Sequence, residues 1–174
     1  SSTGAVLPTT AGSFVALTHT STSAFQANAQ IVLAGGAADF GDRHDIDVHM
    51  SRLSLSGVAD PGFNSPIIDF EGEGPNALQN IAQALTIEAN GKIVAGGFSK
   101  TSSGGTHFAL ARFNANGSLD TGFGSGGKAI TLFSGEDLLD ALTTQGDGKT
   151  VAVGTSLVPG SGTARIVLAR YLGP

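Results

Sequence analysis

The sequence predicts an all-β fold built from three copies of one unit of about 60 residues. The first observation behind this prediction is a set of landmarks that recur at nearly constant spacing. Arg52 and Arg112 are 60 residues apart, and Arg112 and Arg170 are 58 apart. Ile31 and Ile93 are 62 apart. Several landmarks held in register along the chain indicate tandem repetition of one structural unit.

The second observation is the β-strand character of the unit, which is clearest in the second copy. Residues 93–95 and 108–110 are short apolar runs rich in residues that favour strands. Two more strands are expected around residues 84 and 130, so each unit holds about four.

Turn-forming dipeptides separate these runs and are the third observation. They are Asn90-Gly91, Asn116-Gly117 and Asp147-Gly148. Such pairs favour the two positive φ angles of a type I′ hairpin turn. Four antiparallel strands joined by short turns make a blade of a β-propeller, so we predict three such blades. Residues 77–86 have apolar positions at helical spacing, but their repeat partner at 138–143 is too short for a helix, so both are expected to be strands.

The repeat divides the chain into blades at 19–76, 77–135 and 136–174. The third copy stops after Tyr171, before the equivalents of later landmarks. Residues 1–18 contain strand-like stretches and are candidates for a strand that completes this last blade. Loops are expected where the copies differ in length, and these are the candidate contact sites: 36–46, 97–106 and 154–164.

The motifs of the second copy resemble the bacterial delta-60 repeat. They run from Asn90-Gly91-Lys92-Ile93-Val94 through Phe108–Asp120 to Phe123-Gly124. The resemblance covers roughly residues 24–174 and is weakest in the first copy, where Ala29 and Gln30 replace the Gly-Lys pair. It implies a β-propeller of a secreted or surface protein, and hence an extracellular, periplasmic or cell-surface location. It implies no defined activity and no site residues.

Composition excludes several classes of protein. Apolar residues make up 40% of the chain and charged residues 13%, which excludes a disordered chain. The formal net charge of −5 excludes the basic surface that nucleic-acid binding needs. The absence of cysteine excludes disulfides, and no apolar run approaches the length of a membrane span.

One charged stretch suggests a metal site. On a strand, Asp45, Asp47 and His49 share one face. Two carboxylates and an imidazole on one face suit Ca²⁺ or another divalent metal. The alternative is a polar edge strand whose charges prevent pairing with another chain. No other cofactor is expected.

Arginine and aspartate recur at fixed places in the unit. The arginines are Arg52, Arg112 and Arg170, and the aspartates are Asp60 and Asp120. We expect structural hydrogen bonds between neighbouring strands or blades, with a ligand role at equivalent sites as the alternative. Residues 122–127 formally match G-x-G-x-x-G, but no helix is expected after them, so they are interpreted as a turn.

The sequence contains no strong catalytic motif. It has no cysteine nucleophile, no G-x-S-x-G elbow and no H-E-x-x-H motif. The leading hypothesis is a non-enzymatic propeller that binds a protein or glycan at an extracellular surface. The alternatives are an enzyme or enzyme subunit, hydrolase-like, with a site at the central channel or a subunit junction, and a structural spacer of a larger surface protein. Because three blades do not close a ring, we expect a homodimer of six blades or further blades from a longer chain.

Overall fold

The computed structural model describes residues 17–38, 46–64, 66–70, 79–101 and 104–173. This part of the chain contains ten β-strands and no helix, which confirms the all-β prediction. Accordingly, it contains no helix that could cross a membrane.

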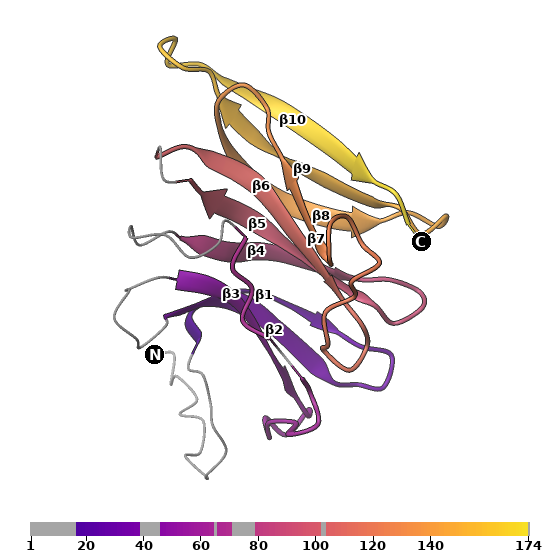
Figure 1. Ribbon diagram of the computed structural model, residues 1–174. Coiled ribbons are helices and arrows are strands. Elements are labelled where there is room, and N and C mark those ends of the chain that lie inside the picture. The colour runs from indigo at the N-terminus through magenta and orange to yellow at the C-terminus, as the bar shows by residue number, and fades with distance from the viewer. Residues whose placement is uncertain (1–16, 39–45, 65, 71–78, 102–103, 174) are drawn as a thin grey trace, which may run out of the picture.

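The strands form three antiparallel sheets, one for each repeat (Figure 1). Sheet 1 contains β1 (Leu17–Phe25), β2 (Ile31–Ala38) and β3 (Ile46–Leu53). Sheet 2 contains β4 (Asn80–Ile87), β5 (Ile93–Lys100), β6 (Thr106–Phe113) and β7 (Lys128–Thr131). Sheet 3 contains β8 (Glu136–Thr144), β9 (Thr150–Leu157) and β10 (Ala164–Tyr171).

The expected four-stranded unit is complete in sheet 2, where the strand order is β4-β5-β6-β7. In sheet 1 the place of the fourth strand is taken by a single bridge. Val48 and Ile68 exchange two backbone hydrogen bonds, at 3.2 and 2.8 Å. Sheet 3 has three strands in the described residues.

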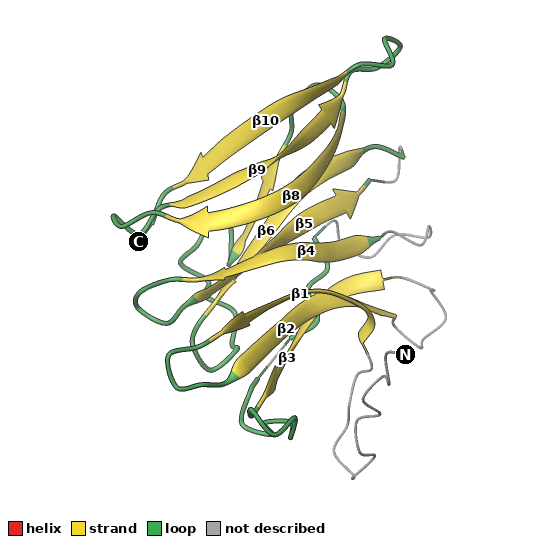
Figure 2. Cartoon of the chain, turned by 180° about the vertical axis from the view of Figure 1, so that it is seen from behind, coloured by secondary structure: helices red, strands yellow, loops and turns green. Residues whose placement is uncertain are grey.

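The sheets stack face to face in chain order, with β1, β4 and β8 side by side along one edge of the stack (Figure 2). One apolar layer joins sheet 1, through Val32 and Met50, to sheet 2, through Ile93 and Phe113. A second layer joins the other face of sheet 2 to sheet 3, and includes Val94, Phe108, Leu110, Leu139 and Ala152. Successive strand residues point to opposite faces, so a sheet buried on both sides carries a continuous apolar run.

The hairpin turns differ from the predicted type I′. Gly91 has φ of 83°, but Asn90 does not have a positive φ. The Gly91 N–H donates to the Glu88 carbonyl at 2.8 Å, and the Glu88 N–H donates to the Lys92 carbonyl at 2.8 Å. This is a three-residue loop in which a type I turn is followed by a left-handed glycine. The side-chain oxygen of Asn90 accepts the Lys92 N–H at 2.9 Å, so the asparagine stabilises this turn through its side chain.

The same hydrogen-bond pattern recurs in the turns at 26–30, 54–58, 114–118 and 145–149. In the first of these, Ala29 occupies the left-handed position with φ of 62°. The structure thus extends the predicted repeat to the conformation of its turns.

Strand positions agree with the prediction in β4, β7 and β8, including the segment at the start of the second repeat for which a helix was considered. The variable loops are shorter than expected, because β2, β5 and β9 extend to Ala38, Lys100 and Leu157. Leu17 pairs with Ala37 and so belongs to the first strand of sheet 1. Residues 1–16, the rest of the candidate completing strand, lie outside the described part.

Candidate functional site: the repeated arginine joint

Arg52 contacts an aspartate and an aromatic ring of its own repeat. Its Nε and Nη2 donate to Oδ2 of Asp60 at 2.9 and 2.7 Å. The ring of Phe63 lies under the guanidinium, with its centroid 4.7 Å from Cζ. The other carboxylate oxygen of Asp60 accepts the backbone N–H of Gly62 at 2.8 Å. The aspartate eight residues after the arginine therefore fixes both the guanidinium and the turn that follows.

The same arginine joins sheet 1 to sheet 2. Its Nη1 donates to the carbonyl of Ala115 at 2.8 Å, and the Gln26 amide donates to the same oxygen at 3.3 Å. Next to it, the backbone N–H of Asn64 donates to the Asn116 carbonyl at 2.8 Å. Residues 114–117 form a turn of sheet 2. We call this contact, between the arginine of one repeat and a turn of the next, the arginine joint.

Arg112 has the equivalent place in sheet 2 and is almost fully buried. Its Nε donates to Oδ2 of Asp120 at 2.7 Å, and the Phe123 ring centroid lies 4.8 Å from its Cζ. Lys92 adds a third group, with Nζ 2.9 Å from the same carboxylate oxygen. Glu88 lies 3.7 Å from Nη1 of Arg112. In sheet 1 the neutral Gln30 and Gln26 take the places of Lys92 and Glu88.

The surroundings of Asp60 and Asp120 favour the ionised form of both carboxylates. The Gly62 N–H and then Arg52 lower the pKa of Asp60 below its usual value. Burial raises the pKa of Asp120, but hydrogen bonds from Lys92 and Arg112 outweigh it, so that pKa is also lowered. Carboxylates that stay charged and guanidinium groups that are already bound form strong hydrogen bonds between neighbouring strands.

The third arginine is different. Arg170 is exposed, and the described residues include no acidic partner for it. Lys149, the equivalent of Lys92, forms its ion pair with Asp147. The structure thus pairs Arg52 and Arg112, two of the three repeated arginines, with the repeated aspartates.

A polar contact between sheets was not expected from the sequence. Asn80, buried at the start of β4, donates to Asp47 at 3.0 Å and to Asp69 at 3.5 Å. Its repeat equivalent is Asp137, which is fully buried at the start of β8 and accepts the Phe133 N–H at 2.8 Å. A polar residue at the same repeat position of both strands was the available signal.

The second of these contacts includes a histidine. His107 Nδ1 lies 3.8 Å from Oδ2 of Asp137, and Ser156 pairs with Asp137 across β8 and β9. His107 Nδ1, Asp137 Oδ1 and Ser156 Oγ are buried without a hydrogen-bond partner. Histidine, carboxylate and hydroxyl groups thus lie near one another where sheets 2 and 3 meet.

The proposed metal face is described only in part, because Asp45 lies outside the described residues. The Asp47 carboxylate binds the Asn80 amide. His49 is buried, and burial lowers its pKa, which favours neutral imidazole. In the ranges that the structure describes, no three His, Asp or Glu side chains form a metal-binding group. The metal site therefore stays a prediction.

The glycine-rich segment at 122–127 is a turn, as predicted. Gly124, Gly126 and Gly127 have positive φ angles, and the strand β7 follows them. A Cβ atom at Gly124 would lie 2.2 Å from the Lys128 carbonyl oxygen, so the close backbone approach requires glycine.

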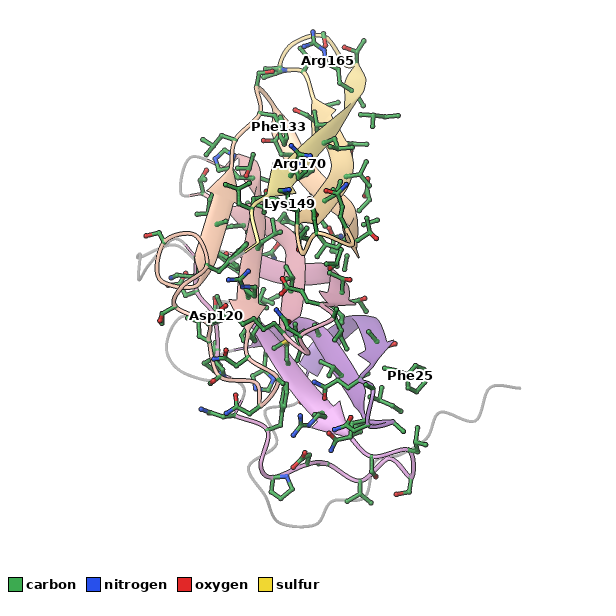
Figure 3. All side chains as sticks on the ribbon, turned by 90° about the vertical axis from the view of Figure 1, so that its right-hand side faces the viewer. Phe25, Asp120, Phe133, Lys149, Arg165 and Arg170 are labelled. Atoms are coloured by element: carbon green, nitrogen blue, oxygen red, sulfur yellow. The ribbon has the colours of Figure 1, made fainter. Side chains whose placement is uncertain are left out.

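Sheet 3 has an uncovered apolar face. Phe108 and Leu110 of β6 are fully buried against sheet 3, whereas their repeat equivalents in β10, Ile166 and Leu168, are 84% and 62% exposed. Arg170 lies on the same face, at the equivalent of the buried Arg112. Figure 3 shows Arg165 and Arg170 on sheet 3, at the opposite end of the stack from Phe25.

A family model described as a domain of unknown function (DUF5122) beta-propeller matches residues 88–123. The matched segment begins at Glu88 and ends at Phe123, and so contains Arg112 together with the side chains around it in sheet 2. No curated protein matches the chain. The match and the three antiparallel sheets together support a β-propeller repeat in this chain.

Proposed function

We propose that this chain is a non-catalytic β-propeller module of three blades that binds a protein partner at an extracellular or cell surface. Sheets 1, 2 and 3 are its blades, and the repeat is of the delta-60 type. The surface location is inferred from the resemblance of the Asn90–Phe123 segment to that repeat. Each blade stacks on the next through an apolar face, an arrangement that supports the assignment of blades.

One observation carries the binding role. Ile166 and Leu168 are exposed on sheet 3. At the same strand positions of sheet 2, the side chains are buried. Apolar faces of this kind mark sites of association with other macromolecules. The face is aliphatic, which favours a protein partner over a glycan, because glycan sites need polar groups and aromatic rings.

A protein microarray and a glycan array, each probed with the wild-type chain and with Ile166→Asp, test this proposal. We expect capture of a protein that is lost in Ile166→Asp and retained in Arg165→Ala, which changes an exposed residue of β10 beside it. Glycan binding that is equal in wild type and Ile166→Asp would contradict the proposal.

A second candidate is catalysis at the junction of sheets 2 and 3, where His107, Asp137 and Ser156 approach one another. A hydrolase would need these groups open to substrate, whereas their unpaired atoms are buried. Turnover of chromogenic ester, glycoside or peptide substrates that is lost in Ser156→Ala would favour this candidate over the binding role.

A further inference from the structure

The arginine joint has two halves that come from different repeats. One half is an arginine on the third strand, and the other is a turn of the following sheet. Inside the chain, Arg52 donates to the Ala115 carbonyl at 2.8 Å, and Asn64 donates to the Asn116 carbonyl at 2.8 Å. The fit is close, because a Cβ atom at Gly117 would lie 2.9 Å from both the Asn64 carbonyl oxygen and the Phe63 ring.

Among the described residues, none occupies the turn half in sheet 1. Residues 54–58 have the same hydrogen-bond pattern as residues 114–118, with Leu55 and Gly57 at the places of Ala115 and Gly117. A Cβ atom at Gly57 would meet no atom within 4 Å. Leu55 and Val58 are exposed large apolar side chains. This turn is therefore shaped for the contact but uncovered.

In the same described ranges, no turn of another sheet meets the arginine half in sheet 3. Arg170 is exposed on the face that also carries Ile166 and Leu168. In sheet 2 the equivalent face is covered by the next sheet. Sheet 1 offers the complementary far face, where Ile31 and Leu33 hold the places of Ile93 and Ala95. The two halves belong to sheets 3 and 1, and Arg170 of sheet 3 and Phe25 of sheet 1 lie at opposite ends of the stack (Figure 3).

We propose that a second copy of this chain occupies the free face of sheet 3, with its sheet 1 stacked on Ile166 and Leu168 and its Leu55 carbonyl accepting from Arg170. The proposal rests on the proposed function, since it names the partner of the same face. The interface joins two different surfaces, so two copies that contact at both ends form a closed ring. Two chains of three sheets each contribute six sheets to it.

Cross-linking tests the contact directly, because the chain has no cysteine of its own. Arg170→Cys in one copy and Leu55→Cys in a second copy, mixed and treated with a short bismaleimide, should give a covalent dimer. Arg165→Cys with Leu55→Cys is the matched control and should give none, since residue 165 faces the other side of β10. Arg52→Cys with Ala115→Cys in one chain measures the reach of the reagent at the internal joint.

Sedimentation equilibrium gives the second measurement. The wild-type chain and Arg165→Ala should dimerise, whereas Ile166→Asp should weaken the dimer by at least about 100-fold, as expected for loss of a buried isoleucine. A wild-type chain that remains a monomer, or a dimer that persists in Ile166→Asp, would overturn this inference. A monomer that still captures a protein on the microarray overturns it while the proposed function survives.

Discussion

Ala29 occupies a backbone position that other turns of the same geometry give to glycine. Its φ is 62°, against 83° and 79° at Gly91 and Gly148. A left-handed conformation costs a residue with a Cβ atom about 1 kcal/mol. The first repeat therefore keeps the turn at a local energetic cost.

We expect Ala29→Gly to raise the free energy of unfolding by roughly 0.5–1 kcal/mol, because it removes this strain. Urea denaturation measures the change. Ala115→Gly is the control, since Ala115 lies in an equivalent turn without a positive φ and should lose stability. Equal losses in both variants would contradict the assignment of strain to Ala29.

The joint aspartates make stability depend on pH. The pKa values of Asp60 and Asp120 are lowered in the folded chain. Their contribution is complete above the unfolded value of about 4 and is lost as the pH falls through the folded values. Urea midpoints measured between about pH 2 and pH 5 should therefore fall with pH, and less steeply in Asp60→Asn and Asp120→Asn.

Asp147→Asn is the control for this experiment. Its carboxylate is also paired, with Lys149, and has a lowered pKa, but this pair is more exposed to solvent than the joint aspartates. Solvent screening leaves such pairs with little effect on stability. An Asp147→Asn profile as flat as that of Asp120→Asn would show that joint burial is not the cause.

At the residue scale, periodicity predicted the recurrence of Arg52, Arg112, Asp60 and Asp120 but not their partners. The Ala115 carbonyl, which Arg52 reaches, is a backbone atom of another repeat, and sequence patterns carry no record of such contacts. The inter-sheet contact of Asn80 was missed for a related reason. It lies in a strand that was recognised by its apolar residues, and the strand pattern does not show which of its polar positions meets a neighbouring sheet.

At the scale of the element, the first hairpin of each repeat contains a bulge. The register shifts between Ala82 and Ala84 in sheet 2 and between Leu139 and Ala141 in sheet 3. A glycine lies opposite in both sheets. A Cβ atom at Gly97 would lie 1.9 Å from the Ile81 carbonyl oxygen. The bulge therefore requires a residue without a side chain in the second strand.

We expect Gly97→Ala to destabilise the chain by about 3 kcal/mol or more, because the clash is with backbone that cannot move independently. Gly146→Ala should change stability by no more than about 0.5 kcal/mol, since nothing lies within 4 Å of a Cβ atom there. Thermal unfolding of both variants measures the difference. A mild effect at Gly97 would show that the bulge adapts.

Strand positions were well predicted, because apolar runs and glycine turns report directly on local structure. The type of hairpin turn was predicted incorrectly. Asn-Gly pairs suit several hairpin loops, and the choice depends on the length of the loop and on hydrogen bonds such as that from Lys92 to Asn90. The start of the loop at 97–106 was placed too early, because β5 continues to Lys100 through Gly97, Ser99 and Lys100, which lack strong strand preference.

At the scale of the whole molecule, the order of the sheets follows the order of the repeats, as the tandem pattern predicted. The pattern could not show in which repeats a given strand position is covered by a neighbouring sheet. Met50 and Leu110 are fully buried, whereas Leu168, at the same place in the third repeat, is 62% exposed. The difference arises from neighbours in space and leaves no trace in the residue type.

Thiol labelling at these equivalent positions tests the stacking of the repeats most directly. The wild-type chain contains no cysteine, so Leu110→Cys and Leu168→Cys each introduce one thiol. At a concentration too low for self-association, Leu168→Cys should react at nearly the rate of a free thiol, and Leu110→Cys at least about 100-fold more slowly. Similar rates at both positions would contradict a stack in which sheet 3 covers sheet 2 and leaves its own outer face open.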